Sequence, residues 1–144
     1  MRVLFVCSGN ICRSPFAEAV ARQIAPGTDH EFASAGTIAI EGGPATSTGI
    51  AVAAEMGVDL LPHRAAHLSK RMITESDIVY AMEAEHADAV LAIVQGARVE
   101  LLNPDGDPIA DPYGGDRTEY RVSYQLIMDA LENRLGEQDR RQGR

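Results

Sequence analysis

The 144-residue sequence has few basic residues and no long apolar run, and each shortage excludes a class of protein. Thirteen Lys and Arg residues against 21 Asp and Glu residues give a formal net charge of −8, which repels a phosphate backbone, so no nucleic-acid partner is expected. The longest apolar run, residues 89–94, is far too short to cross a bilayer, and the first residues leave no room for a signal-peptide core. We therefore expect a cytoplasmic protein that has no membrane partner.

Cysteine is also scarce. Cys7 and Cys12 are too few for a disulfide framework or a zinc site, so no metal is expected, and their proximity is the informative feature. An apolar content of 45% in a chain of this length suits one domain with a full hydrophobic core. We assign residues 1–137 to that domain and expect residues 138–144 to form a disordered polar tail.

Short apolar runs alternate with amphipathic segments along the chain. Strands are predicted at residues 3–6, 31–35, 78–82 and 99–102, and helices at residues 15–24, 46–56, 84–94 and about 118–135. The first run is continuously apolar, as in a strand buried on both faces. This alternation predicts a three-layer α/β fold, with a four-stranded parallel sheet, helices on both faces, and a ligand site at the carboxyl ends of the strands.

The loop between the first strand and the first helix, residues 7–14, is suited to bind an anion. Free backbone N–H groups and the helix dipole favour negative charge at a helix N-terminus. Gly9 and Asn10 readily adopt positive φ, so successive N–H groups can form a concave nest around a phosphate dianion. Arg13 can hold two phosphate oxygens, and Ser14 is expected to cap the helix before Pro15.

The same dipoles stabilise a thiolate, which predicts Cys7 as a nucleophile. A cysteine six residues before an arginine is a weak pattern by itself, because most free cysteines pack as small hydrophobes. The preceding strand and the helix start supply the context that the motif requires. The predicted phosphate-binding residues are Ser8, Gly9, Asn10, Ile11, Cys12, Arg13 and Ser14.

Residues 3–15, Val-Leu-Phe-Val-Cys-Ser-Gly-Asn-Ile-Cys-Arg-Ser-Pro, closely resemble the opening of the low-molecular-weight protein tyrosine phosphatases. The likeness continues through residues 34–37, His63, residues 77–82 and the Asp-Pro-Tyr of residues 111–113, and covers nearly the whole chain. The resemblance implies a phosphatase that needs no cofactor. Its implied substrate is phosphotyrosine in proteins or peptides, and its implied product is inorganic phosphate.

By this resemblance, Cys7 attacks phosphorus to form a phosphocysteine, while Arg13 and the loop amides stabilise the equatorial oxygens. One carboxyl group must protonate the leaving phenolate and then activate water, and the resemblance assigns Asp111 to this role. Asp107 is a rival because it also precedes a proline. Tyr113 favours Asp111, since it offers an aromatic wall on a loop that is able to move.

Further roles are implied by the same resemblance. The Ser14 hydroxyl is expected to bond the Cys7 thiolate, and Ser34 and His63 occupy the positions that support the strained backbone of Asn10. Cys12 either forms a reversible protective disulfide with Cys7 or packs as a small hydrophobe. The predicted walls of the substrate cleft are Ile11, Ile40 and Tyr113.

Two alternative functions remain open. The loop after Ser34 and the Asp-Pro-Tyr-Gly-Gly ending are similar to a bacterial branch that includes protein-arginine phosphatases. That branch typically has threonine where this chain has Ile11, which favours phosphotyrosine here. A thioredoxin-linked arsenate reductase needs two further cysteines, and none follows Cys12. A non-catalytic phosphate-binding module would use the same loop and arginine without an acid.

Overall fold

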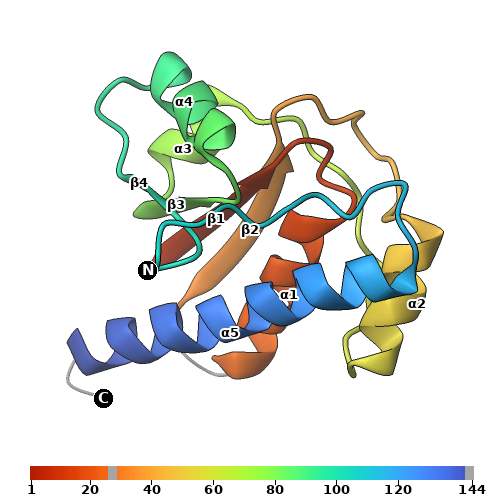
Figure 1. Cartoon of the computed structure of the whole chain (residues 1–144). Coiled ribbons are helices and arrows are strands. Elements are labelled where there is room, and N and C mark those ends of the chain that lie inside the picture. The colour runs from red at the N-terminus through yellow and green to blue at the C-terminus, as the bar shows by residue number, and fades with distance from the viewer. Residues whose placement is uncertain (26–28, 142–144) are drawn as a thin grey trace.

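The computed structural model describes residues 1–25 and 29–141, the last of these, 137–141, by backbone alone. Its elements in chain order are β1 (Arg2–Cys7), α1 (Arg13–Ile24), β2 (Glu31–Gly36), α2 (Ser47–Glu55), α3 (Lys70–Thr74), β3 (Ile78–Ala81), α4 (Ala84–Ile93), β4 (Val99–Leu101) and α5 (Arg117–Arg141). The strands form a four-stranded parallel sheet in the order β2-β1-β3-β4. The predicted fold class is therefore confirmed (Figure 1).

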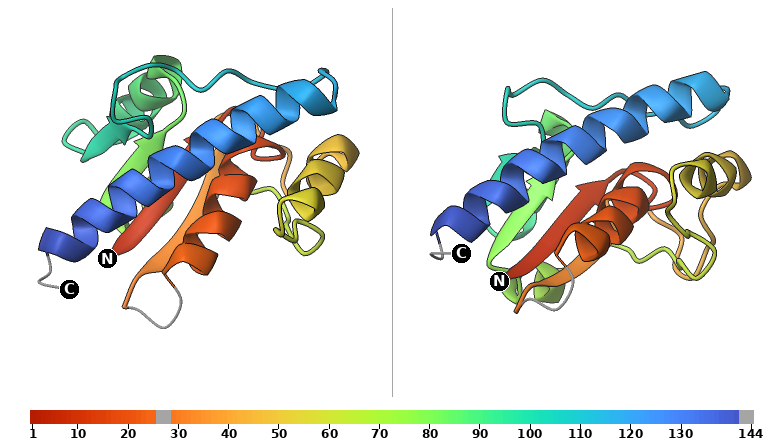
Figure 2. Two further views of the ribbon diagram at one scale, coloured as in Figure 1. Left: turned by 60° about the horizontal axis from the view of Figure 1, so that its bottom comes forward. Right: turned by 90° about the horizontal axis from the view of Figure 1, so that it is seen from below.

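Helices cover both faces of the sheet because β1 presents apolar side chains to each side. Val3 and Phe5 belong to the larger core, which includes residues of α1 and α5, whereas Leu4 and Val6 belong to a smaller core under α3 and α4. Figure 2 shows α1 and α5 together on one side of the sheet. Phe16 of α1 stacks on Tyr124 of α5 with 3.9 Å between ring centroids, a contact that adds about 0.5–1.5 kcal/mol to simple burial.

The topology places the first loop where a ligand is expected. β1 has β2 on one side and β3 on the other, so the chain reverses its direction of progress across the sheet at β1. Ligands of open parallel sheets bind in the crevice beyond the carboxyl ends of the strands at such a point. The segment after Cys7 lies there.

Two helix limits differ from the predicted ones by more than one residue, and one helix was not predicted. Helix α1 begins at Arg13, so Ser14 lies inside the helix and is not its cap. Helix α3 was not predicted, because its five residues are too few to show periodicity, and it is started by the Ser69 hydroxyl accepting from Met72 N at 3.2 Å. Helix α5 continues to Arg141, so its backbone includes residues 138–141 of the predicted tail. Residues 142–144 of the predicted tail lie outside the described residues.

Among the described residues, no helix has both the length and the apolar character that crossing a membrane requires.

Candidate active site

A cavity of about 210 Å³ at the end of β1 brings most of the predicted site together. The residues that line it are Cys7, Ser8, Gly9, Ile11, Cys12, Arg13, Ile38, Asp111 and Tyr113. The predicted nucleophile, arginine and acid therefore share one cavity, although Asp111 is about a hundred residues from the loop in the chain.

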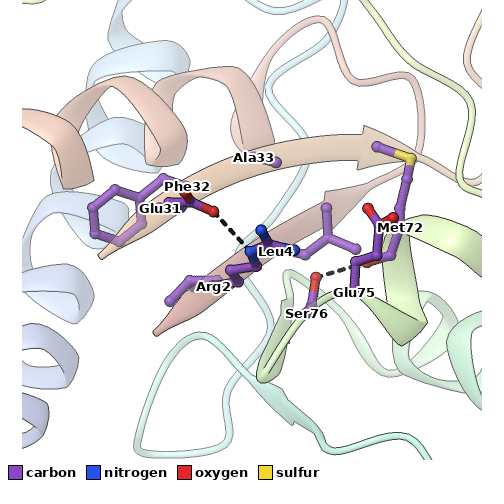
Figure 3. Close-up of a pocket in the computed structure, with 9 residues that line it drawn as sticks. Arg2, Leu4, Glu31, Phe32, Ala33, Met72, Glu75 and Ser76 are labelled. Carbon is purple, nitrogen blue, oxygen red and sulfur yellow. Dashed lines mark hydrogen bonds and ion pairs between the residues drawn. The ribbon is translucent and has the colours of Figure 1, made fainter. Parts of the chain in front are cut away.

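A larger cavity, of about 520 Å³, lies between the start of the sheet and α3. Figure 3 shows that Leu4, Ala33 and Met72 line it, together with the ion pair between Arg2 and Glu31 at 2.8 Å. Among the described residues that line this cavity there is no predicted catalytic residue. The smaller cavity is thus the candidate active site, since reactive groups and not volume define one.

The loop is held in shape by Asn10, which has a φ of 55° in the left-handed region. Its side-chain amide donates to Ser14 Oγ at 2.7 Å and to Ser34 Oγ at 2.9 Å, and its Oδ1 accepts from Ala66 N at 2.9 Å. Its backbone carbonyl accepts from His63 Nε2 at 2.7 Å. The contacts expected of Ser34 and His63 are therefore present, and together they support a backbone conformation that costs about 1–3 kcal/mol.

The Ser14 hydroxyl is directed at the nucleophile. Ser14 Oγ lies 2.9 Å from Cys7 Sγ and accepts from Asn10, so its own hydrogen can go to the sulfur or to the more distant Ala35 O at 3.5 Å. The prediction that Ser14 caps the helix is therefore wrong, because its hydroxyl contacts Cys7 and Asn10 instead. Cys12, the residue before α1, makes no side-chain capping bond to the described residues. The first backbone N–H groups of the helix are therefore not used by this cap and can donate to an anion.

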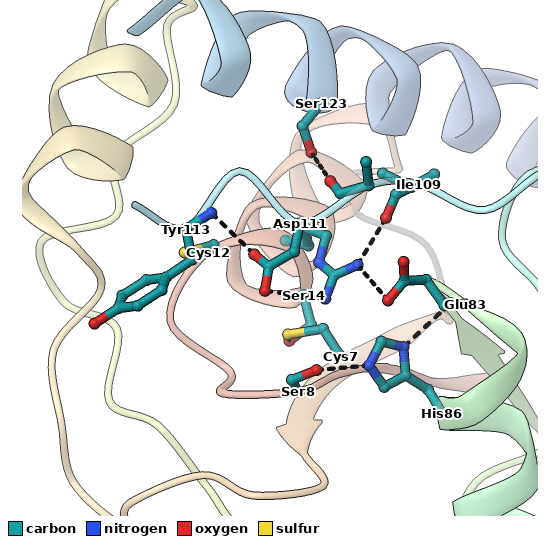
Figure 4. A network of polar contacts seen from close by, with 12 residues as sticks. Cys7, Ser8, Cys12, Ser14, Glu83, His86, Ile109, Asp111, Tyr113 and Ser123 are labelled. Carbon is teal, nitrogen blue, oxygen red and sulfur yellow. Dashed lines mark hydrogen bonds and ion pairs between the residues drawn. The ribbon is translucent and has the colours of Figure 1, made fainter. Parts of the chain in front are cut away.

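Arg13 is buried, with 1% of its side chain exposed, and is held from three sides. Its Nη1 donates to Ile109 O at 2.7 Å and lies 3.2 Å from Glu83, and its Nη2 lies 3.6 Å from Asp111. Figure 4 shows Ile109, Glu83 and Asp111 in this arrangement. Arg13 Nε is buried and has no hydrogen-bond partner within the described part of the chain. An unpaired charged donor in a cavity wall is suited to receive an anion.

Asp111 also lines the cavity, with 43% of its side chain exposed. Its Oδ1 accepts from Tyr113 N at 3.0 Å, and the preceding residue, Ala110, accepts at its carbonyl from Ser123 of α5 at 3.3 Å. The rival Asp107 is exposed and is absent from the described lining of the cavity. The preference for Asp111 is thus supported by position.

Ile40 does not line the cavity as expected: its side chain is 83% exposed, and among the described lining residues the apolar position on this segment is Ile38. The reason is that the hydrogen bonding between the β1 and β2 segments continues beyond the end of β2. Thr37 N donates to Cys7 O at 3.0 Å and Ile38 N donates to Ser8 O at 2.9 Å, which holds Ile38 at the loop. Ile11 and Tyr113 are in the lining as predicted.

The second cysteine is in a different environment from the first. Cys12 Sγ lies 3.4 Å from Tyr120 Oη and 3.8 Å from Thr46 Oγ1. Burial raises the pKa of the Cys12 thiol, and the hydrogen bonds from Tyr120 and Thr46 offset this only in part. Cys12 is therefore a thiol at neutral pH and not a competing nucleophile.

Sequence reasoning missed Ile38, Glu83 and His86. Glu83 follows the end of the β3 segment, so the rule that ligands bind at the carboxyl ends of parallel strands offered a signal for it. His86 carried no such signal, because its partner, Ser8, is 78 residues away.

Gly36 offers a test of the loop geometry. A Cβ there would lie 2.4 Å from Ser8 O and 2.8 Å from Asn10 N, both backbone atoms that cannot easily move. We expect Gly36→Ala to reduce aryl phosphate hydrolysis severely and to lower the free energy of unfolding by about 1–3 kcal/mol. Urea denaturation and steady-state kinetics measure both. Gly96→Ala is the control, because its Cβ would meet nothing within 4 Å, and equal behaviour of the two variants would contradict the geometry.

The chain is similar over nearly its whole length to several known proteins. The family model described as low molecular weight phosphotyrosine protein phosphatase matches residues 2–142. The probable low molecular weight protein-tyrosine-phosphatase AmsI of Erwinia amylovora is 36% identical over 134 residues, which cover 90% of this chain and 92% of that protein. The crystal structure of AmsI has a TM-score of 0.89 at 34% identity and covers 94% of this chain and 91% of its own. The protein-arginine-phosphatase of Geobacillus stearothermophilus is 36% identical over 146 residues, covering 93% of this chain and 95% of that protein.

Proposed function

Because the chain belongs to the low molecular weight phosphotyrosine protein phosphatase family, we propose that it dephosphorylates phosphotyrosine in proteins or peptides, with Cys7 as the nucleophile. The observation that carries this proposal is the shared cavity. Cys7 Sγ, the unpaired Nε of Arg13 and the carboxylate of Asp111 all belong to residues that line it. A nucleophile, an anion receptor and an acid are the parts that phosphoryl transfer needs.

In the first proposed step, the Cys7 thiolate attacks phosphorus in line with the tyrosine oxygen. The S–P bond forms and the P–O bond to the tyrosine breaks, while Asp111 in its acid form gives a proton to the leaving oxygen. The Ser14 hydroxyl, 2.9 Å from the sulfur, stabilises the thiolate before the attack. Arg13 and the loop amides stabilise the equatorial oxygens.

In the second proposed step, water attacks the phosphocysteine. The Asp111 carboxylate takes a proton from this water, a new P–O bond forms, and the S–P bond breaks to release inorganic phosphate and restore the thiolate. Because 43% of the Asp111 side chain is exposed, the group can accept a proton from a water molecule that enters from solvent.

Phosphoarginine is the alternative substrate, since one relative is a protein-arginine-phosphatase. Ile11 supports phosphotyrosine instead, because it adds an apolar wall beside Cys12 and Tyr113 that suits a phenyl ring better than a guanidinium. Phosphoserine is too short for its phosphate to reach the floor of the cavity while its backbone stays outside.

A substrate panel tests this choice. We expect the wild-type enzyme to hydrolyse a phosphotyrosine peptide at least about tenfold faster, by kcat/KM, than phosphoserine or phosphoarginine peptides of the same flanking sequence. Ile11→Thr should reduce the difference in kcat/KM between the phosphotyrosine and phosphoarginine peptides. Phosphate release, measured under conditions that spare the acid-labile P–N bond, gives the rates. If the wild-type enzyme prefers phosphoarginine, the proposed substrate is wrong, but the proposed mechanism is unaffected.

We also propose that the enzyme works in the cytoplasm and that Cys7 and Cys12 form a reversible redox pair. The supporting observations are that both are free thiols and that both line the same cavity. Thiols stay reduced in the cytoplasm, where a nucleophilic cysteine needs protection only from transient oxidants.

A further inference from the structure

His86 is a buried histidine with a polar contact on each ring nitrogen. It lies in the first turn of α4 with 1% of its side chain exposed. Its Nε2 lies 2.8 Å from Ser8 Oγ in the loop, and its Nδ1 accepts from the backbone N–H of Glu83 at 3.1 Å. Figure 4 shows the ring between Ser8 and Glu83, so it links the loop after β1 to the segment after β3.

The two contacts determine which nitrogen carries hydrogen. A backbone N–H can only donate, so Nδ1 of His86 must be the acceptor, and the neutral ring then carries its hydrogen on Nε2. This Nε2–H donates to Ser8 Oγ. A doubly protonated ring would place an N–H on Nδ1 against the N–H of Glu83.

The surroundings favour the neutral ring. Burial lowers the pKa of His86 first, and the positive charge of Arg13 lowers it further, while Glu83 and Asp111 raise it to a smaller extent. A further charged group, Glu85, has a carboxylate oxygen 3.7 Å from Nε2 but is 72% exposed, so water screens it.

This arrangement orients the Ser8 hydroxyl. Because Ser8 Oγ accepts from His86, its single hydrogen is not used in that contact and is available to an acceptor in the cavity, which Ser8 lines beside Cys7. Without the histidine, the hydroxyl would be free to rotate and would lose this preference.

The same ring also acts on the arginine. The Glu83 backbone is held by Nδ1 of His86, and the Glu83 carboxylate lies 3.2 Å from Arg13 Nη1. A shift of Glu83 would remove one of the three contacts that orient the buried guanidinium. Ser8 and Arg13 line the same cavity, and His86 contacts Ser8 directly and Arg13 through Glu83.

We propose that His86 is a positioning residue for phosphate: it presents the Ser8 hydroxyl as a donor to the phosphoryl group and holds Glu83 in contact with Arg13. The proposal rests on the proposed function, because it assumes that the cavity binds a phosphoryl group. It predicts that His86 contributes to binding of the phosphoryl group throughout the reaction and thus to KM more than to kcat.

The first test is inhibition by inorganic phosphate. In His86→Asn the shorter amide can still meet the Glu83 N–H but cannot reach Ser8, so we expect both KM and the inhibition constant of phosphate to rise by about three- to tenfold, with a smaller change in kcat. Ser8→Ala should cause a similar loss. Adding His86→Asn to Ser8→Ala should cause little further loss, because without the Ser8 hydroxyl the histidine has no donor left to orient.

His67→Asn is the matched control, since His67 is exposed and lies outside the described lining of the cavity. Unchanged phosphate inhibition in His86→Asn would overturn the proposal, as would fully additive effects of the Ser8 and His86 variants. Equilibrium dialysis with inorganic phosphate on the same proteins needs no turnover. If the wild-type protein hydrolyses no phosphopeptide, but His86→Asn still binds phosphate more weakly than the wild type, the proposed function fails and the role of His86 in phosphate binding stands.

A second test uses the wild-type protein and does not depend on the folding of a variant. Nitrogen-15 NMR of the imidazole should show the neutral ring with hydrogen on Nε2 at pH 7. A ring with hydrogen on Nδ1, or a charged ring at this pH, would overturn the proposal.

Discussion

Replacing Cys7 by serine is expected to lower kcat for an aryl phosphate by at least about four orders of magnitude. A serine hydroxyl is a weak nucleophile without an adjacent base, and its nearest described partner, the Ser14 hydroxyl at 2.9 Å from the present sulfur, donates a hydrogen and does not remove one. The loop amides and Arg13 are untouched by the change. Phosphate binding should therefore remain.

Steady-state kinetics and calorimetric titration with inorganic phosphate measure the two halves of this prediction. Cys12→Ser is the comparison, because its thiol has a raised pKa and contacts Tyr120 and Thr46; it should lower kcat far less than Cys7→Ser. Turnover by Cys7→Ser close to that of the wild type would refute covalent catalysis by Cys7. Trapping of a phosphoenzyme at Cys7 of the wild type would support it directly.

The second large effect is expected at Asp111. Asp111→Asn should lower kcat by about 10²–10⁴-fold, because an amide can neither protonate the leaving oxygen nor activate water. The substitution is conservative in shape: Oδ1 of the asparagine can still accept from Tyr113 N, as Oδ1 of the aspartate does at 3.0 Å. The loss should be larger for phenyl phosphate than for p-nitrophenyl phosphate, whose better leaving group needs less help from an acid.

Asp107→Asn is the matched control for this experiment. Asp107 precedes Pro108 as Asp111 precedes Pro112, but it lies outside the described lining of the cavity and should retain nearly wild-type kcat. Equal losses of kcat in both variants would mean that the conformation of the loop, and not the carboxyl group of Asp111, determines the rate. A protein without measurable turnover in any form would instead be a phosphate-binding module.

The order of strands and helices was predictable because it depends on local patterns. A continuously apolar run marks a strand buried on both faces, and alternation with amphipathic helices requires a parallel sheet. Helix limits were less predictable: α1 begins at Arg13 because Ser14 bonds Cys7 and Asn10 in preference to the helix N-terminus. That choice depends on groups brought near by folding.

The site residues also fall into those that the sequence indicated and those that it did not. Cys7, Arg13 and Asp111 were found from a spacing, a loop and a resemblance, and the structure places them around one cavity. Ile40 was assigned to the wall from the resemblance. The sequence does not show how far the β2 pairing continues beyond the strand, and this pairing places Ile38 at the cavity instead. Glu83 and His86 were missed because their partners, Arg13 and Ser8, come from a distant part of the sequence.

The sequence by itself therefore determined the α/β class, and it predicted the anion-binding loop and the nucleophile. These follow from hydrophobic periodicity and from residue types whose conformational and chemical preferences act over a few neighbouring positions. Only the tertiary structure decided which Asp-Pro carboxylate lines the cavity with the thiol, which isoleucine lines it and which ring nitrogen faces Ser8. Those outcomes depend on hydrogen bonds between segments far apart in the chain, and such bonds exist only once the sheet has assembled.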